Sequence, residues 1–546
     1  MNASETSATD AEVQPDGLFR PPALSEWIFA CALVVLLFCI NLATYNRYPN
    51  VWCDEVWFSE PAVNEVLHGT FTTSTWQFQP ANTFPTVNCP LYQLALVPWL
   101  KVTGTSLLAV RSFNYLILGI SAWLLWFASW RMKIIASPLA RLLLLFILHL
   151  GYGISFAYRC SRPDMIGLLF LALLFLSFLI RRRPLRFVSQ FVLAALLVWI
   201  GLQVALFAAF AAGLGWILLR RVTFRELMVL ALGMITGLCS VLAFFAQKGV
   251  LQYFLPMVFG WLGKNYAHEP HVSAVRKILT LAKYSAGTYF DDFTMLLLSA
   301  GLVLFLLAAR HRFTANTRKL LVFALILVFG VPPLFYLAGH YMFYYAYARF
   351  VPASVAFFAA ASELGLFWLS ANATQSARLA PQWLRPVSYL LLLGAAALGL
   401  PLRLAFTVAS AELEPRSKMQ ATLKAALHKD DIVFCDNGPF FEVKKASDIV
   451  YGIYYSSAFL HEHIQGHDFS PEEKNSINVL VIRPELADYT TNYFGSRWEP
   501  VGQPFGDLQD LGKLASVPII GSRLAHYAQQ PQTQRYQIQV FRKQAP

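Results

Sequence analysis

The chain has 546 residues, of which 57% are hydrophobic and only 14% are charged. Soluble globular domains are close to half apolar and about a quarter charged, so this composition excludes an ordinary soluble protein and indicates that lipid surrounds much of the chain. The formal net charge is +12, but the lysines and arginines concentrate in short loops between apolar runs. That distribution is typical of membrane proteins, so nucleic acid is not an expected partner.

Apolar runs that can cross a bilayer recur along the sequence, and such a helix needs about 20 residues. The runs cover residues 26–45, 107–130, 138–157, 165–180, 226–246, 293–309, 320–338, 351–370 and 387–407. The stretch 187–219 is too long for one helix, and Gly201 and Gln203 near its middle predict two short spans. The predicted fold is therefore an all-α polytopic membrane domain over residues 26–407, with about eleven transmembrane helices.

Four clusters of basic residues predict which side of this domain faces the cytoplasm. The clusters are Arg131/Lys133/Arg141, Arg181/Arg182/Arg183/Arg186, Arg220/Arg221/Arg225 and Arg310/Arg312/Arg318/Lys319. Residues 1–25 then form a cytoplasmic tail, and an odd number of spans places the C-terminus outside. We expect a multi-pass protein of the plasma (inner) membrane.

Residues 408–546 have the composition of a soluble domain. Apolar runs of β type at 431–434, 476–482 and 536–541 alternate with polar helical stretches such as 418–428. This alternation predicts a small α/β domain on the outer face of the membrane.

The first exterior segment, 46–106, begins with two adjacent acids, Asp54 and Glu55, directly after the first span. Acids at the membrane boundary are expensive and often functional, and a carboxylate here can take a proton from an attacking hydroxyl. The same acids also suit the start of a helix, because residues 55–68 have a helical pattern. Position alone does not separate a catalytic base from a helix cap.

A second polar feature, Arg162-Pro163-Asp164, lies between the third and fourth spans, on the same predicted side as Asp54. Pro163 can open the next helix with Asp164 in its first turn, where a negative charge is favoured. Alternatively, Asp164 faces Asp54 across a cavity, and Arg162 holds a phosphate or orients a carboxylate.

In order and in side of the membrane, these features resemble the polyprenyl-phosphate-dependent glycosyltransferases of the GT-C fold, a group that includes protein O-mannosyltransferases and lipid A aminoarabinose transferases. The resemblance extends to an amphipathic stretch that ends at Gly69, to Pro90-Leu91-Tyr92, and to the Gly104 and Arg111 that follow. It covers residues 26–180 well, is looser to about residue 407, and does not include the tail.

The resemblance implies that Asp54 is the catalytic base, Glu55 its essential neighbour and Asp164 the second acid of the cavity. Asn88 stands where the family often has a basic residue that holds the donor phosphate, so this contact is expected from other residues. The expected phosphate-binding residues are Arg111, Arg162, His340 and Arg349. The expected cavity residues are Asn88, Tyr92, His268 and Tyr345.

Several other polar groups have two interpretations. His268 before Pro270 resembles a family loop that helps to bind metal or phosphate, but it is also an ordinary interfacial histidine. The aromatic segment 341–352 anchors the interface, and with Arg349 it can also line a groove for a lipid phosphate. The cluster 461–468 lacks the His-Glu-x-x-His spacing of a zinc site and is expected to be a loop. Cys53 and Cys89 share one exterior segment and are candidates for a disulfide.

The resulting hypothesis is an inverting transfer of sugar from a polyprenyl-phosphate donor to an acceptor at the outer face. The acceptor is a membrane lipid, a glycan or a protein. A divalent ion (Mg, Mn or Zn) between Asp54 and Asp164 is an optional cofactor. The alternatives are a lipid or glycan transporter or flippase, which would favour charges inside the spans, and a non-catalytic membrane scaffold.

Overall fold

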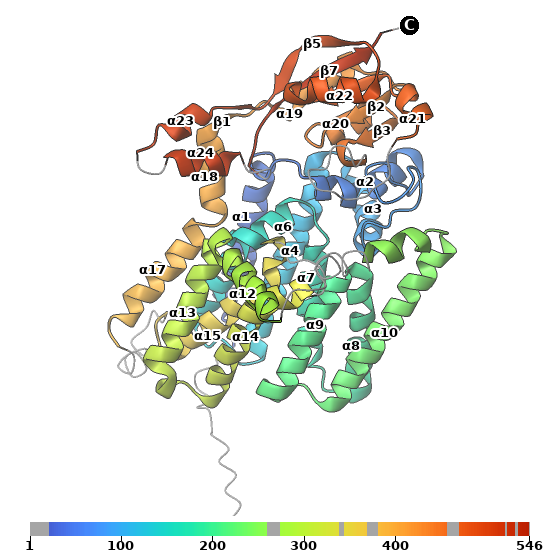
Figure 1. Ribbon diagram of the computed structural model, residues 1–546. Helices are drawn as coiled ribbons and strands as arrows, with labels where there is room; N and C mark the ends of the chain where they lie inside the picture. The colour runs from blue at the N-terminus through green and yellow to red at the C-terminus, as the bar shows by residue number, and fades with distance from the viewer. Residues whose placement is uncertain are drawn as a thin grey trace, which may run out of the picture.

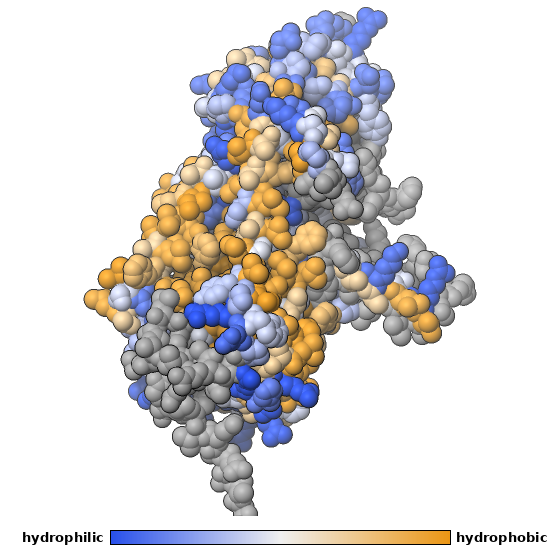
Figure 2. All heavy atoms as spheres, turned by 90° about the vertical axis from the view of Figure 1, so that its left-hand side faces the viewer, coloured by the Kyte–Doolittle hydropathy of each residue, from blue (hydrophilic) through white to orange (hydrophobic). Residues whose placement is uncertain are grey.

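The computed structural model describes residues 21–258, 274–337, 343–367, 381–455, 469–518, 521–529 and 533–544. A helical domain lies beneath a smaller α/β domain, which is at the top of Figure 1. In Figure 2 apolar residues cover the visible flank of the helical domain, and the α/β domain above them is largely polar. Three predicted features, His268, His340 and the segment 461–468, lie outside the described residues.

Seven described helices are long and apolar enough to cross a membrane, which makes this an integral multi-pass membrane protein. They are α1 (Leu24–Ala43), α4 (Leu107–Arg131), α8 (Arg183–Ile200), α9 (Leu202–Leu214) with its extension η2 (Gly215–Leu219), α10 (Phe224–Gln247), α13 (Phe293–Ala309) and α14 (Ala315–Leu337). Two bent pairs raise the number to nine: α5 (Pro138–Leu150) with α6 (Tyr152–Arg159), bent by 61°, and α17 (Leu384–Ala397) with α18 (Leu400–Ser410), bent by 45°.

Two further predicted spans correspond to shorter helices, α7 (Asp164–Ser177) and α15 (Tyr347–Glu363). By length and composition the described helices therefore do not confirm the predicted eleven spans. The stretch 187–219 does divide into two helices at Gly201, as predicted. Pro163 directly precedes α7, whose first residue is Asp164, which also agrees with the prediction.

Glycines allow two of the spans to approach closely. A Cβ atom on Gly233 or Gly237 of α10 would lie only 2.5 Å and 2.6 Å from the carbonyl oxygens of Phe191 and Ala195 on α8. Small residues at such crossings let helix backbones pack in lipid, where van der Waals contact replaces the hydrophobic effect as the source of association.

The segment between α1 and α4 folds against the top of the helical domain (Figure 1). It contains α2 (Cys53–His68), which ends at Gly69 with φ +70°, and α3 (Leu91–Thr103). The segment between α10 and α13 contains α12 (Ala274–Asp291). The predicted helix at 55–68 is confirmed, and its true start lies two residues earlier.

The tail forms a five-stranded mixed sheet with the order β3-β2-β4-β7-β5. Strands β2 (Ile432–Cys435), β3 (Ile449–Gly452) and β4 (Val479–Ile482) are parallel, and β7 (Gln537–Lys543) pairs antiparallel with β4 and β5 (Trp498–Gly506). The other elements are β1 (Ala411–Glu412), α19 (Arg416–Ala426), α20 (Phe440–Ala446), α21 (Pro471–Ser476), α22 (Ala487–Phe494), β6 (Leu508–Gln509), α23 (Leu511–Ala515) and α24 (Gly521–Ala528). Strands occur in all three stretches where the sequence predicts them.

A buried polar contact joins the tail domain to α2. Glu60 is fully buried and accepts hydrogen bonds from the Thr73 and Thr75 hydroxyls at 2.6 Å and from the Ser74 backbone amide. Lys444 of α20 lies 3.4 Å from the same carboxylate and is itself buried. The Ser74 carbonyl also accepts a hydrogen bond from the Gly452 amide at the end of β3. The tail thus packs on the helix whose first turn carries Asp54 and Glu55.

We expect Lys444→Met to destabilise this contact by about 1–3 kcal/mol, since it removes one partner of a buried charge that keeps its other donors. The apparent melting temperature of the detergent-solubilised protein should fall by several degrees. The matched control is Lys445→Met on the same helix, which forms no ion pair within the described residues. Equal melting temperatures of the Lys444→Met and Lys445→Met variants would show that the Glu60–Lys444 contact does not stabilise the attachment of the tail domain.

Candidate active site

The first turn of α2 is fixed by a buried ion pair. Glu55 accepts hydrogen bonds from Arg111 of α4 through both carboxylate oxygens, at 2.7 Å from Nε and 2.6 Å from Nη2. Both side chains are fully buried. Such a bidentate pair has one favoured geometry, so it fixes both the position and the rotation of the helix start.

Arginines also bind the chain that leads into α2. The Arg111 guanidinium donates to the Tyr45 and Pro49 carbonyls. Arg159, at the end of α6, donates to the Tyr48 carbonyl at 2.6 Å and to the Asn41 side chain of α1. These bonds satisfy carbonyls of an irregular segment that is buried away from water. The segment between α1 and α2 is therefore held from two sides.

Asp54 points to a different partner from Glu55. Arg162 donates from Nη1 to Asp54 Oδ2 and from Nε to Asp164 Oδ2, the latter at 2.9 Å. Its guanidinium carbon also lies 3.5 Å from the centre of the Tyr344 ring, a cation–π contact. The structure thus brings together three predicted site residues, Asp54, Arg162 and Asp164, which we call the acid–arginine cluster.

The backbone before Arg162 has an uncommon conformation. Ser161 has φ +49°, in the left-handed region that residues with a side chain seldom adopt. The Arg162 carbonyl accepts a hydrogen bond from the Asn114 amide at 2.8 Å, which anchors the turn. Positive φ at a non-glycine residue is often retained at functional sites. Here it turns the chain between α6 and α7 so that the Arg162 guanidinium reaches both Asp54 and Asp164.

Exposure distinguishes the three acids. The Asp54 side chain is 11% exposed, whereas those of Asp164 and Glu55 are 3% and 0% exposed. Asp54 is therefore the acid that an arriving molecule reaches first. One of its oxygens is bound to Arg162, and the other has only a weak contact with the Cys53 thiol at 3.6 Å.

The arrangement does not favour a metal ion between Asp54 and Asp164. The Arg162 guanidinium already bridges the two carboxylates, and a cation would have to displace it. In the part of the chain that the structure describes, no three His, Cys, Asp or Glu side chains lie together in a way that suits a metal.

Arg111, which the sequence predicts to bind the donor phosphate, lies in the buried pair with Glu55. Its guanidinium is completely buried and is bound to Glu55 and two carbonyls, so this geometry gives no support to a contact with the donor phosphate. Arg349 is buried on α15 and donates to the Thr288 hydroxyl of α12 at 3.0 Å. Arg162 is the arginine that bridges Asp54 and Asp164.

The predicted cavity residues occupy different places. Tyr345 borders the cluster, with its ring centre 5.9 Å from the Arg162 guanidinium carbon. Tyr92 is buried, and burial, reinforced by the Glu55 and Asp164 carboxylates, raises the pKa of its hydroxyl well above the ordinary value, so the group stays protonated. Asn88 lies instead at the α8–α9 turn, where a Cβ on Gly201 would be 3.4 Å from its side-chain oxygen.

Cys53 and Cys89 are both free thiols in the structure. Burial raises the pKa of each to about 12, so neither is a thiolate at neutral pH. A disulfide between them is not part of this conformation.

A second polar group lies above the cluster, at the carboxyl ends of the parallel tail strands. Asp436, directly after β2, accepts hydrogen bonds from Arg483 at 2.8 Å and from the Tyr536 hydroxyl at 2.9 Å. Tyr454, just after β3, lies with its ring centre 6.1 Å from that of Trp57 on α2. We call Asp436, Tyr454, Arg483 and Tyr536 the tail edge. Open α/β sheets bind ligands at this edge, and here it faces the start of α2.

The sequence analysis did not predict the hydrogen bond between Arg159 and Asn41, and it did not predict the tail edge. A signal for the first is present, because an arginine at the end of an apolar run needs a buried partner. The tail edge gives no comparable signal, since its members are separated by up to 100 residues and meet only through the sheet order.

These features define a class of fold. Solved structures similar to this chain include ArnT from Cupriavidus metallidurans bound to undecaprenyl phosphate, with a TM-score of 0.50 and 13% identity over 89% of this chain and 98% of that chain. They also include an Archaeoglobus fulgidus oligosaccharyltransferase, with a TM-score of 0.51 and 11% identity over 86% of this chain and 70% of that one. The protein therefore has the GT-C fold. No protein-family model matches the sequence, and no curated protein does either.

The buried pair yields a stability prediction. Glu55→Gln leaves the Arg111 charge buried without its counter-charge, which typically costs about 3–5 kcal/mol. We expect a large loss of folded protein and a lower melting temperature, whereas the double variant Glu55→Gln/Arg111→Gln should recover part of that loss. Fluorescence-detected gel filtration and thermal scans measure both effects. Additive losses in the double variant would show that the two residues do not act as a pair.

Proposed function

We propose that the protein is a glycosyltransferase that moves a sugar from a polyprenyl-phosphate donor to an acceptor hydroxyl, on the face of the membrane domain that carries the tail. The observation that carries the proposal is the acid–arginine cluster: the most exposed acid, Asp54, shares a guanidinium with a deeper acid, Asp164. The fold supports it, because ArnT, which shares that fold, is seen with undecaprenyl phosphate.

Asp54 acts as the base in this proposal. The acceptor oxygen attacks the anomeric carbon from the face opposite the phosphate, so the configuration inverts. The bond between that carbon and the phosphate oxygen breaks, and its electron pair leaves with the polyprenyl phosphate. Asp54 takes the proton of the attacking hydroxyl and later releases it to water.

Arg162 provides the positive charge. With both acids ionised, the cluster of two carboxylates and one guanidinium has a net charge of −1. One negative charge therefore remains that can accept the proton of the attacking hydroxyl. A donor phosphate offers Arg162 a second anionic partner with matching fork geometry. Movement of Arg162 toward the phosphate would free the Asp54 oxygen that it now occupies, and would stabilise the charge that develops on the leaving group.

Asp54→Asn should lower transfer by about 10²- to 10⁴-fold, the usual contribution of a positioned base. The assay is release of free polyprenyl phosphate by purified protein in lipid vesicles, with a panel of polyprenyl-phosphate sugars and a membrane extract that supplies acceptors. Glu65→Gln is the matched control, because it removes one carboxylate from the other end of α2. Normal release by a well-folded Asp54→Asn variant would remove Asp54 as the base. Absence of release by the wild type with every donor in the panel would favour a transporter or scaffold.

The metal question has its own test. Because Arg162 already bridges the two acids, we expect release to be unchanged after treatment with a chelator of divalent ions. If the chelator instead abolished release, and added magnesium, manganese or zinc restored it, the reaction would require a divalent ion.

We further propose that the acceptor binds between the cluster and the tail edge. Arg483 is the tail-edge cation, and its side chain is partly exposed, whereas Asp436 beneath it is buried. Tyr454 bridges this edge to Trp57, and Trp57 follows Asp54 by three positions on α2. A polar acceptor that enters under the tail would meet these groups on its way to Asp54.

Arg483→Gln should raise the KM for the acceptor roughly ten-fold and leave the donor KM unchanged, since a hydrogen bond to a charged group contributes about 1.5–3 kcal/mol. Initial rates at varied concentrations of each substrate separate the two constants. Lys429→Gln, an exposed tail cation paired with Asp448, is the control. Equal effects on both KM values, or on neither, would remove the tail edge from acceptor binding.

A further inference from the structure

An elongated cavity lies inside the helical domain, below the acid–arginine cluster. Its volume is about 660 Å³, and residues of α4, α7, α9, α14 and α15 line it. Tyr347, Val351, Val355 and Ala359 line it at intervals of four residues, so one face of α15 forms a wall along most of the helix. From Tyr347 to Glu363 this wall is roughly 24 Å long.

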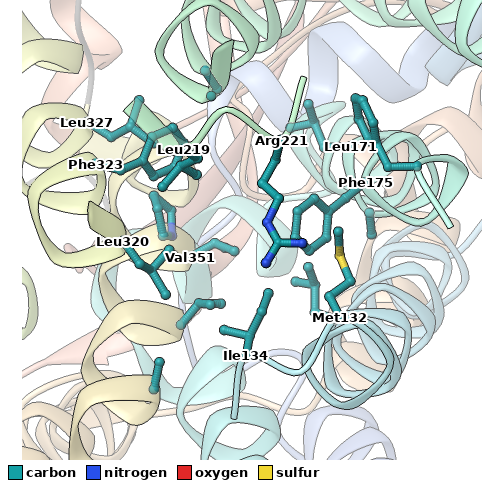
Figure 3. A pocket seen from close by; sticks show the side chains of 18 of the residues that line it. Met132, Ile134, Leu171, Phe175, Leu219, Arg221, Leu320, Phe323, Leu327 and Val351 are labelled. Atoms are coloured by element: carbon teal, nitrogen blue, oxygen red, sulfur yellow. The ribbon is translucent and has the colours of Figure 1, made fainter. Parts of the chain in front are cut away.

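The two ends of the cavity differ in character. The upper end is apolar and aromatic, with Tyr347 and with Leu168, which follows Asp164 by one turn of α7. The lower end lies among the basic loops and is lined by Arg131, Arg221 and Lys319. In Figure 3 the Arg221 side chain extends into the pocket. Met132 and Phe175 lie on one side of it, and Val351 and Leu320 lie on the other.

The basic end offers positive charge that the protein does not neutralise. Arg221 and Lys319 are exposed and form no ion pair within the described ranges. The acid at this end, Glu363, already accepts hydrogen bonds from the Thr314 amide and the Thr317 hydroxyl. A long apolar tube that opens among cations matches a molecule with one hydrocarbon chain in the tube and an anionic group at its mouth.

We propose that this cavity binds an anionic phospholipid from the leaflet opposite the tail domain, with one acyl chain between α7 and α15 and the phosphate beside Arg221 and Lys319. The occupied cavity would brace two helices that approach the cluster: α7 begins with Asp164, and α15 follows Tyr344 and Tyr345. This inference does not depend on the proposed reaction, because lipid binding is measured without it.

The test is native mass spectrometry of the purified full-length protein, delipidated in detergent and titrated with phosphatidylglycerol or phosphatidylcholine of equal chain length. We expect phosphatidylglycerol to be retained at least roughly ten-fold more tightly, and R221Q/K319Q to abolish that preference. The matched control R181Q/R182Q removes two basic residues from the same face that do not line the cavity, and it should bind like the wild type.

A second variant tests the tube itself. Ala212→Phe places a ring in the cavity wall and should reduce phosphatidylglycerol retention while R181Q/R182Q retains it. Three results would overturn the proposal: equal retention of both lipids by the wild type, undiminished retention by R221Q/K319Q, or competition by farnesyl phosphate as strong as by phosphatidylglycerol. The last would assign the cavity to prenyl chains.

Discussion

The buried pair of Glu55 and Arg111 is the contact on which the geometry of this site depends. Two charges placed out of water are costly, and only close, complete hydrogen bonding compensates for that cost. Here both Glu55 oxygens are used, and the remaining arginine donors reach carbonyls of the segment before α2. Asp54 therefore owes its position to an ion pair that it does not itself join.

Asp54, one residue before Glu55, also pairs with a buried arginine. Asp54 and Asp164 come from helices that are more than 100 residues apart, and Arg162 joins them. An arginine between two acids is stable, yet it is also able to exchange one partner for a phosphate at little electrostatic cost. Rigid supports on one side and an exchangeable cation on the other suit the proposed reaction, in which the site binds an anionic donor and releases an anionic product.

Much of this arrangement was predictable from local sequence. Asp54, Glu55, Arg162 and Asp164 stand out because charges next to apolar runs are rare, and the predicted topology puts them on one side of the membrane. The partner of each residue was not predictable, since the sequence analysis expects both Arg111 and Arg162 to bind the donor phosphate. Only the hydrogen bonds across the structure show that Arg111 pairs with Glu55.

The sequence predicted some element boundaries and the strands of the tail, but not the number of spans or the tail edge. The break at Gly201 follows from a stretch too long for one helix, and strands β2, β4 and β7 follow from short apolar runs. The count of eleven spans is not confirmed because α7 and α15 are short and because two apolar runs bend sharply, features that depend on packing rather than on hydropathy. The tail edge depends on strand order, which no local pattern encodes.

The most direct measurement is a cryo-EM structure of the Asp54→Asn variant with a polyprenyl-phosphate sugar bound. The account predicts that the donor phosphate contacts Arg162 and that the anomeric carbon faces position 54, with the Glu55–Arg111 pair intact. A donor phosphate bound elsewhere, with Arg162 still bridging position 54 and Asp164, would contradict it.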